Sequence, residues 1–447
     1  SLDLKSSKKD TQNVILQWIK KNHKYKNKSW EGDIVAKRII SWISNSKLTY
    51  EDGDLAYKEK FNNIIKKQTN HLINEIENSK WIDDKILGCA AIILVGLSYK
   101  DKSYYLNSGF DLLKKIIKFS FDNNNFPKSR NIRQLNFYLK YFVLIREWLK
   151  ESQNEIPEYI DENIYYLGQA YAFFWKNIKK DIFFNGNCKS NNAQFDKYLE
   201  RLGYNFKNQS SELGGYVVLS NKKTTLIMDV GSSPDKKFSK NYQAGALSFE
   251  IISGDKKLIC NSGYFQNSKH QLNELSKSSA VHNVLTLDDR SSCEFSKTSG
   301  SMVAQGLKII NKNIIFEKNY WKISSSHDGY LKRYGIIYER EIEFYPEKTK
   351  FIGHDKIILK NKIKNLKFEI RFHLDPNVKI MKTQDNKSIL IELDSEGWKF
   401  KSNDNEINID NGLYFGKKNS FIDNQNIFIS GMTNIENQTI KWELTKL

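Results

Sequence analysis

The hydrophobic pattern of the chain changes once, near its middle. Up to about residue 179, apolar residues recur at the spacing of helices, as Val14, Ile15, Trp18 and Ile19 do near the N-terminal end. Further helices are expected over residues 34–42, 56–78, 83–98, 103–121, 131–150 and 157–177, with Asp33 as the N-cap of the first of these. Roughly seven antiparallel helices with short polar connections are typical of a helical bundle or an α/α toroid.

From Tyr216 onward the apolar positions alternate with polar ones, which is the period of half-buried strands. Strands are expected over residues 216–219, 225–229, 314–316, 335–344, 356–359, 368–373, 389–393 and 426–429. Strands without helices between them predict a large antiparallel β-sandwich. The predicted fold class is therefore α+β multidomain. An incomplete α/α toroid over residues 1–205 is followed by the sandwich over residues 206–447.

Residues 242–293 combine strand patterns with many polar residues. Leu247, Phe249 and Ile251 alternate with Ser248 and Glu250, which indicates a half-buried strand. A hairpin turn over 253–255 leads to a returning strand over 258–260, and a third strand covers 284–287. The polar residues at the strand ends are Gln243, Asn261, Tyr264, His282 and Asn283. A sheet that gathers them at one rim is a candidate site; the alternative is that they only cap the strands.

Two polar loops add candidates. The stretch 122–131 places Arg130 and Asn131 at the start of a predicted helix, where a guanidinium and free N–H groups suit a carboxylate or sulfate. The alternative is that Ser129 or Asn131 only caps this helix. The stretch 181–187 ends the helical half and contains the turn pair Asn185-Gly186, which is also compatible with a plain linker.

Composition restricts the partners. The net charge of +18 favours an acidic partner such as a polysaccharide, nucleic acid or membrane surface, although a coding bias towards Lys, Asn and Ile would leave the same surface. The basic residues are scattered and form no RNA-binding signature, so nucleic acid is not favoured. The four cysteines show no CxxC spacing. No apolar run is long enough for a membrane span, and no signal peptide is visible.

Other titratable residues are expected to be structural. His327 and His373 read as satisfied polar groups at strand ends. Residues 338–341, Tyr-Glu-Arg-Glu, read as an exposed ion-pair face.

Five blocks together resemble the heparinase II/III-like polysaccharide lyase family, and the resemblance covers most of the chain. The blocks are Gly214-Gly-Tyr216, Asp229-Val-Gly231, Ala246-Leu-Ser-Phe-Glu250, Asn261-Ser-Gly-Tyr264 and Ala280-Val-His-Asn-Val284. The resemblance implies cleavage of uronate-containing polysaccharides by β-elimination. In that reaction a polar group neutralises the uronate carboxylate, Tyr or His removes the C5 proton, and a Tyr protonates the leaving oxygen.

Positions of the family motifs suggest roles for individual residues. Asn131 resembles the carboxylate-binding Asn, His282 the His of the sandwich, and Tyr264 a Tyr close to the substrate. Tyr242 is a second candidate for proton transfer. The further substrate-binding candidates are Arg130, chosen for its charge, with Gln243, Asn261 and Asn185.

The chain departs from the family pattern where a His-x-His-Ala-Asp block is usual, since residues 241–245 read Asn-Tyr-Gln-Ala-Gly. Asn241 stands at the position of a catalytic His and cannot act as a base. The residues that match a zinc site of some members are Gln243, Asn261 and His282, and two neutral amides are weak zinc ligands. No metal and no cofactor are therefore predicted, and these three side chains are expected to hydrogen-bond one another instead.

Three functions follow as hypotheses. The first is a lyase acting on an acidic polysaccharide; the second is a non-catalytic glycan-binding or envelope-biogenesis protein on the same scaffold. The third is a nucleic-acid binder, which would show steep salt dependence. The resemblance implies a periplasmic location, while a cytoplasmic one stays open. The sequence does not set the sugar, its sulfation, the endo or exo mode or the oligomeric state.

Overall fold

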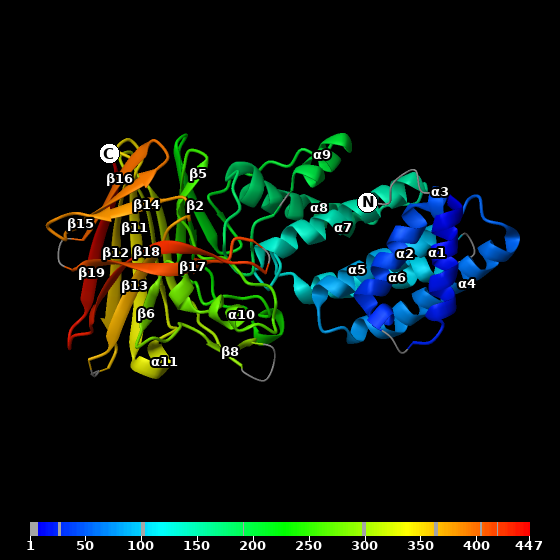
Figure 1. Ribbon diagram of the computed structural model, residues 1–447, viewed down its shortest axis with the longest axis horizontal. Coiled ribbons are helices and arrows are strands. Elements are labelled where there is room, and N and C mark those ends of the chain that lie inside the picture. Colours follow the sequence, from blue (N-terminus) through cyan, green and yellow to red (C-terminus); the bar gives the residue numbers. More distant parts are fainter. Residues whose placement is uncertain are drawn as a thin grey trace. The chain divides into compact units, whose positions relative to one another are not determined.

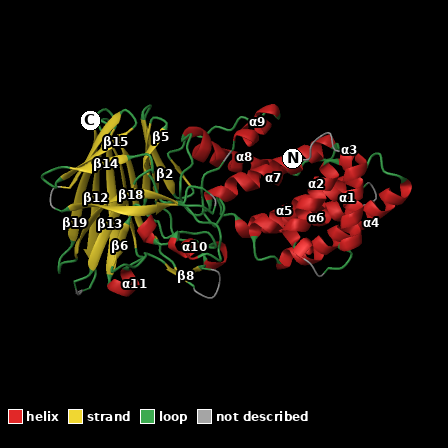
Figure 2. Cartoon of the chain, in the orientation of Figure 1, coloured by secondary structure: helices red, strands yellow, loops and turns green. Residues whose placement is uncertain are grey.

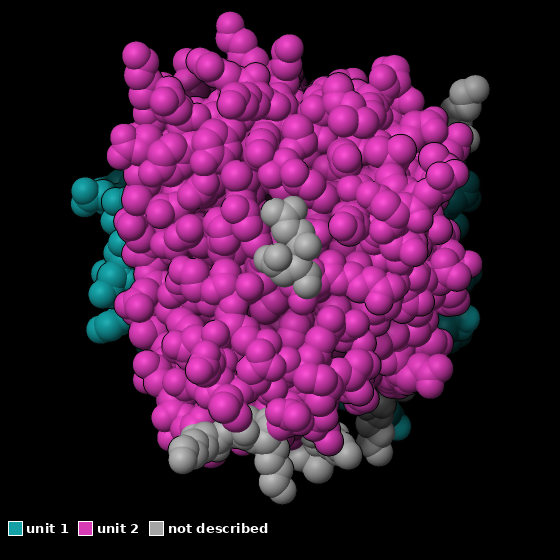
Figure 3. All heavy atoms as spheres, turned by 90° about the vertical axis from the view of Figure 1, so that its left-hand side faces the viewer, with its two compact units in different colours: residues 1–125, 134–168 teal, residues 126–133, 169–447 magenta. Residues whose placement is uncertain are grey.

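The computed structural model describes residues 8–25, 28–99, 103–190, 192–296, 301–361, 365–402, 405–417 and 419–447 (Figure 1). The chain forms two compact units, one of residues 1–125 and 134–168, the other of residues 126–133 and 169–447 (Figure 3). Helices make up the first unit, and strands dominate the second (Figure 2). Residues 126–133 and 169–205, which the sequence analysis placed in the helical domain, belong to the strand-rich unit.

Helix α5 (Ile82–Ser98) is the buried centre of the helical unit. Every residue from Ile86 to Val95 is buried, as expected for a helix that is apolar on all sides. It packs against α2 (Gly32–Ser44) and α6 (Ser103–Ser120). The other α-helices in the described part of the chain are α1 Lys8–Lys21, α3 Ser46–Thr49, α4 Leu55–Glu75, α7 Ile132–Glu151, α8 Glu158–Tyr171 with a π-helical turn Ala172–Asn177, α9 Ala193–Arg201, α10 Gln271–Leu275 and α11 Leu331–Tyr334.

The predicted helices are confirmed to within a few residues. One cap is not. Asp33 lies inside the first turn of α2, where it pairs with Lys37, and Glu31 holds the N-cap position. None of the described helices is both long and apolar enough to cross a bilayer.

The described residues of the strand-rich unit form three larger sheets and one two-stranded ribbon, in which every pair of neighbouring strands is antiparallel. The strand orders are β1-β2-β3-β4-β5, β14-β15-β16-β19-β12-β11-β10-β9, β17-β18-β13-β6 and β7-β8. The bounds are β1 Glu212–Leu213, β2 Tyr216–Ser220, β3 Thr224–Asp229, β4 Phe249–Ser253, β5 Lys256–Ile259, β6 Leu285–Leu287, β7 Glu294–Phe295, β8 Val303–Gln305, β9 Ile309–Phe316, β10 Trp321–His327, β11 Ile336–Tyr345, β12 Lys350–Leu359, β13 Lys367–His373, β14 Lys379–Lys382, β15 Ser388–Leu393, β16 Glu396–Ser402, β17 Ile407–Tyr414, β18 Ile422–Met432 and β19 Gln438–Lys446. The predicted antiparallel sandwich is confirmed.

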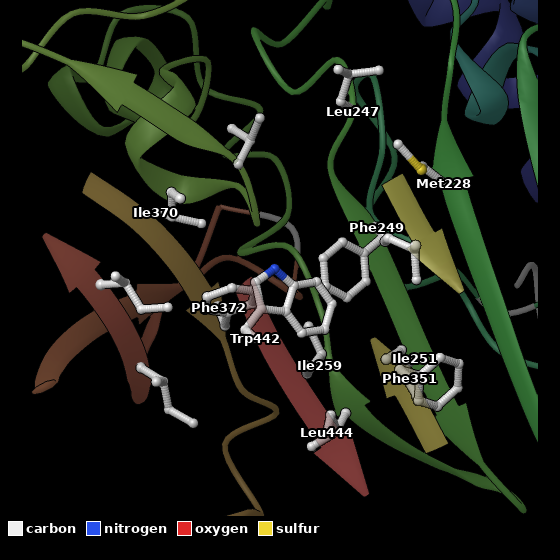
Figure 4. Packing of buried hydrophobic residues seen from close by; sticks show 14 of the residues in the cluster. Met228, Leu247, Phe249, Ile251, Ile259, Phe351, Ile370, Phe372, Trp442 and Leu444 are labelled. Atoms are coloured by element: carbon white, nitrogen blue, oxygen red, sulfur yellow. The ribbon is translucent and has the colours of Figure 1, made fainter. Parts of the chain in front are cut away.

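One tryptophan links the three larger sheets in the core of this unit. Trp442 on β19 stacks on Phe249 of β4 with ring centroids 5.4 Å apart, and it meets Phe372 of β13 edge-on at 5.1 Å (Figure 4). Gly353 on the neighbouring strand β12 leaves room for the indole, which a Cβ there would overlap. Aromatic pairs of this kind add to the burial of apolar area that holds the sheets together.

The strands predicted within residues 242–293 exist, but they do not form one sheet. Strands β4 and β5 belong to the five-stranded sheet, whereas β6 belongs to the four-stranded sheet. Strand β4 begins only at Phe249, because Leu247 turns the chain with a φ of +66°. Glu250, expected on a polar face, is fully buried and pairs with the buried Lys257. The hairpin turn is confirmed, with Gly254 at a φ of +55°.

Arg340 on β11 and Asp355 on β12 form a fully buried ion pair, with 2.7 Å between Nε and Oδ1. The other carboxylate oxygen accepts a hydrogen bond from Trp442 Nε1 at 2.8 Å. Arg340 Nη1 donates to two backbone carbonyls from outside its own sheet. The expectation of an exposed ion-pair face over 338–341 is therefore wrong at Arg340.

We predict that Arg340→Met destabilises the protein by about 3–5 kcal/mol, because it leaves the Asp355 carboxylate buried without a counter-ion. Urea denaturation followed by tryptophan fluorescence measures this loss. Lys356→Met is the matched control, since it breaks the partly exposed pair with Glu339 on the same two strands. That control should cost less than about 1 kcal/mol. Equal losses in the two variants would contradict the assigned role of the buried pair.

Candidate active site

The turn Asn185-Gly186 is the point where several of the predicted site residues meet. Both residues have positive φ values, +46° and +87°, which favours glycine at the second position. The Gly186 N–H donates to Gln243 Oε1 at 3.0 Å. A Cβ on Gly186 would lie 2.7 Å from Asn241 Cβ and 2.9 Å from Asn131 Nδ2. The side chains of Asn131 and Asn241 therefore meet over a residue that has no side chain of its own.

Asn131 caps helix α7 with its oxygen. Its Oδ1 accepts a hydrogen bond from the Arg133 N–H at 3.0 Å, and the residue is buried. Because the oxygen is used in the cap, the amide presents its nitrogen towards Gly186. Capping and ligand binding are thus compatible roles, since the cap needs an acceptor and a carboxylate ligand needs a donor.

Tyr264 continues this group of polar side chains. Its hydroxyl donates to Asn241 Oδ1 at 3.0 Å and accepts from Asn273 Nδ2, on α10, at 3.1 Å. Burial raises the pKa of the Tyr264 phenol, while the Asn273 amide and the charge of Arg133 act in the opposite direction. We call Asn131, Gly186, Asn241, Tyr264 and Asn273 the amide–phenol cluster.

Sequence patterns identified this cluster only in part. Asn131 and Tyr264 were predicted as site residues, and the Asn-Gly pair predicted the turn at Gly186. Asn241 stood out only as a departure from the family pattern. Asn273 was missed, and nothing in its sequence surroundings marks it, because its partner Tyr264 and its second acceptor, the Phe265 carbonyl, are known only from the fold.

Arg130 is a buried anchor and does not offer its charge to a ligand. Nη2 pairs with Asp229 Oδ1 at 2.6 Å and also donates to the Gly215 carbonyl at 3.1 Å. Nε donates to the Gly214 carbonyl at 3.1 Å, and Nη1 to that of Ser232 at 3.3 Å. The prediction that Arg130 binds a substrate carboxylate is corrected, because each guanidinium nitrogen is engaged inside the protein.

Asn185 belongs to the same anchor. Its Nδ2 donates to the Tyr216 hydroxyl at 2.5 Å and to Asp229 Oδ2 at 3.0 Å. The Tyr216 hydroxyl in turn donates to the Arg130 carbonyl at 2.8 Å. The structure therefore assigns Asn185 a positioning role behind the turn, in place of the predicted contact with substrate.

Gln243, Asn261 and His282 do not hydrogen-bond one another, contrary to the prediction. The oxygen and the nitrogen of the Gln243 side-chain amide both bond to backbone partners, and Asn261 Oδ1 accepts from the Asn283 N–H at 3.0 Å. These residues do not fit a zinc ion. The oxygens of Gln243 and Asn261 already accept hydrogen bonds, and His282 Nε2 is the one possible ligand atom of the three side chains without a partner among the described residues. No group of three or more His, Cys, Asp or Glu residues suited to a metal occurs in the described part of the chain.

His282 is a buried, neutral imidazole. Its Nδ1 lies 2.8 Å from the Ser278 carbonyl, which assigns the proton to Nδ1. Burial lowers its pKa to about 4. Gly245 covers the ring, and Nε2 has no partner among the described residues. The nitrogen that could act as a base is thus enclosed by protein.

Tyr242 is enclosed as well. The side chain is buried in a small apolar cluster with Cys293, Val303 and Leu307, and its hydroxyl finds no nitrogen or oxygen partner among the described residues. Burial raises the pKa of the phenol well above its ordinary value. The predicted proton transfer by Tyr242 has no support in this geometry.

Comparison with known proteins identifies the scaffold. Residues 208–443, more than half of the chain, match the family model described as Heparinase II/III-like, C-terminal. The chain belongs to the heparinase II/III-like family. Heparan sulfate lyase HepC from Pedobacter heparinus matches with a TM-score of 0.73 and 14% identity over 98% of this chain and 73% of that one. A heparinase III structure matches with a TM-score of 0.77, 14% identity and the same coverages. A search of curated protein sequences found no match.

The structural likeness confirms a heparinase III-type fold, a helical domain followed by a β-sandwich, as the sequence predicted. At these identities it establishes the fold alone.

We predict that three buried histidines make this family member sensitive to acid. Burial lowers the pKa of His282 to about 4 and those of His327 and His373 to about 3. All three values lie below the roughly 6.5 of an unfolded histidine, so the unfolded state takes up protons first as the pH falls. Their stabilisation is complete above about pH 6.5 and declines by about 1.4 kcal/mol per pH unit and histidine down to about pH 4.

Urea denaturation between pH 7.5 and 4.5 measures this slope. His373→Gln should reduce it by the share of one proton relative to the unsubstituted protein. A slope that is the same in both proteins would contradict the prediction.

Proposed function

We propose that this chain is a polysaccharide lyase that cleaves an acidic, uronate-containing glycan by β-elimination. Membership of the family supports this proposal, and the amide–phenol cluster carries it. In that cluster the Tyr264 phenol is held by Asn241 and Asn273, in the same group as the Asn131 amide at the start of α7. An amide donor and a phenol are the two kinds of group that the reaction needs.

In this proposal the Asn131 amide hydrogen-bonds the uronate carboxylate. The N-terminus of α7 adds a partial positive charge at the same place. A neutralised carboxylate makes the C5 proton more acidic and stabilises the negative charge that develops when that proton leaves.

Tyr264 performs both proton transfers. As a phenolate it removes the C5 proton; as the resulting phenol it returns that proton to the glycosidic oxygen at C4. The C4–O bond breaks, a C4–C5 double bond forms, and the phenolate is regenerated. Because burial raises the pKa of Tyr264, the phenolate is scarce at neutral pH, and the reaction is faster in alkaline solution.

A non-catalytic glycan-binding protein is the second candidate, favoured by two observations. Tyr264 is only 4% exposed and already makes two hydrogen bonds. Asn241, which accepts one of these hydrogen bonds from the Tyr264 hydroxyl, is an amide and cannot act as a base towards it. Either candidate places an acidic polysaccharide on a chain with a net charge of +18, and a periplasmic location agrees with both.

We predict formation of an unsaturated uronate, detected by ultraviolet absorbance, on at least one of heparan, chondroitin, hyaluronan and alginate. The rate should be insensitive to a chelator and should rise with pH above neutrality. Tyr264→Phe should lower kcat/KM by about 100-fold or more, since it removes the proton-transfer group. Tyr242→Phe is the control, because that phenol lies outside the amide–phenol cluster. A rate unchanged by Tyr264→Phe would contradict the mechanism, and no product from any polymer would favour the binding protein.

Asn241→His tests whether a missing base limits the rate. An imidazole at this position accepts the Tyr264 proton near neutral pH, so the rate at pH 7 should increase about tenfold or more and depend less on pH. The control Asn241→Gln keeps an amide and should bring no gain. If the histidine variant is no faster than the glutamine variant, Tyr264 is not the proton-transfer group.

A further inference from the structure

A cavity of about 490 Å³ lies elsewhere on the strand-rich unit. The β2–β3 hairpin, the β9–β10 hairpin, the 209–211 segment and the residues that end the π-helical turn surround it. Its volume falls in the range of about 300–1,000 Å³ that is usual for small-molecule sites. No residue of the amide–phenol cluster lines it.

The walls of this cavity are uncharged. Charged residues make up 27% of the chain, yet none of the lining residues is Lys, Arg, Asp, Glu or His. A carboxylate, sulfate or phosphate group would lose its hydration here without gaining an ion pair. The cavity therefore suits a ligand that is polar but neutral.

Two aromatic rings form one wall. Phe316 ends β9 and Trp321 begins β10 as a directly paired cross-strand couple, with ring centroids 5.8 Å apart. Trp321 rests on Phe344 from the core side at 5.5 Å, whereas Phe316 is 53% exposed. The core thus holds Trp321 in place, and the outer surface of the pair is open. Covering that surface with the apolar face of a ligand is favourable.

Amide and hydroxyl groups face the same cavity. Gln209 and Ser211 make no side-chain hydrogen bond to the described part of the chain, and the hydroxyls of Ser220 and Thr225 pair with each other at 2.7 Å. Amides and hydroxyls both donate and accept, as the neighbouring hydroxyls of a sugar ring do.

We propose that this cavity binds a neutral sugar residue of a glycan chain. The C–H face of the pyranose ring covers Phe316 and Trp321, and its hydroxyls hydrogen-bond to Gln209 and Ser211. A uronate would need a cation, and a stack of nucleobases would need a basic groove along it; the cavity has neither. This inference does not depend on the proposed lyase reaction.

Saturation-transfer NMR with cellohexaose, mannohexaose, maltohexaose and chitohexaose tests the proposal. At least one should bind with a Kd of about 1 mM or below and receive saturation on its ring C–H protons. Phe316→Ala and Gln209→Ala should each weaken binding about fivefold or more, through the lost ring face and the lost amide. Ile310→Ala is the matched control, because Ile310 is 45% exposed on the same strand but lies outside the cavity.

Phe316 and Gln209 are chosen because both are exposed, so their removal spares the core that Trp321 helps to form. Absence of binding by all four oligosaccharides would overturn the proposal. So would binding that both variants leave unchanged, or equally tight binding of a hexauronate at this site. Tyr264→Phe should leave binding intact, which separates this cavity from the lyase site.

Discussion

The buried ion pair between Arg130 and Asp229 positions the candidate site. It joins the segment before α7 to the end of β3, with 2.6 Å between Nη2 and Oδ1. Gly215 and Gly231 approach the guanidinium so closely that a Cβ on either would crowd it, and Asn185 satisfies the second carboxylate oxygen. Arg130 itself has a φ of +55°, a costly conformation that these contacts impose. Asn131 follows it directly, so the anchor sets where the amide nitrogen lies.

The same unit separates its charges from its reactive groups. Buried Glu250 pairs with Lys257 and buried Arg340 with Asp355, which keeps the desolvation cost of these four charges tolerable. The groups left for chemistry are amides and a phenol, all neutral in the resting state. A neutral cluster can bind and orient an acidic sugar through donors, yet proton transfer then rests on one phenol whose pKa burial has raised. Whether this phenol can transfer protons, more than the fold, therefore decides between a lyase and a binding protein.

Sequence patterns predicted the elements well and their partners poorly. Helices such as α5 and strands such as β11 follow a strong local period, and both were predicted nearly to the residue. The sheets were not, because pairing is non-local: β6 pairs with β13, some eighty residues on, and not with β4 or β5. Arg130 looked free because Asp229, its counter-ion, lies 99 residues away in sequence.

The candidate site shows the same limit at the level of single side chains. Family blocks located Asn131, Tyr264 and His282, since these positions depend on local motifs. Burial then divided them: the Tyr264 phenol joins the amide–phenol cluster, while Gly245 and the surrounding protein enclose His282. No local pattern distinguishes a histidine at a rim from one sealed beneath it, because the covering groups come from distant segments.

The basic residues lie outside both candidate binding sites. Neither the amide–phenol cluster nor the uncharged cavity contains a lysine or arginine, although the chain carries a net charge of +18. The basic residues therefore act from outside both places, through a long-range field that concentrates an acidic polymer near the surface. Such attraction weakens with salt, whereas contacts from amides, hydroxyls and aromatic rings depend much less on it. For a polymer with alternating acidic and neutral sugars, the rate of association would then fall as salt is added. The preference for one neutral sugar over another would change little.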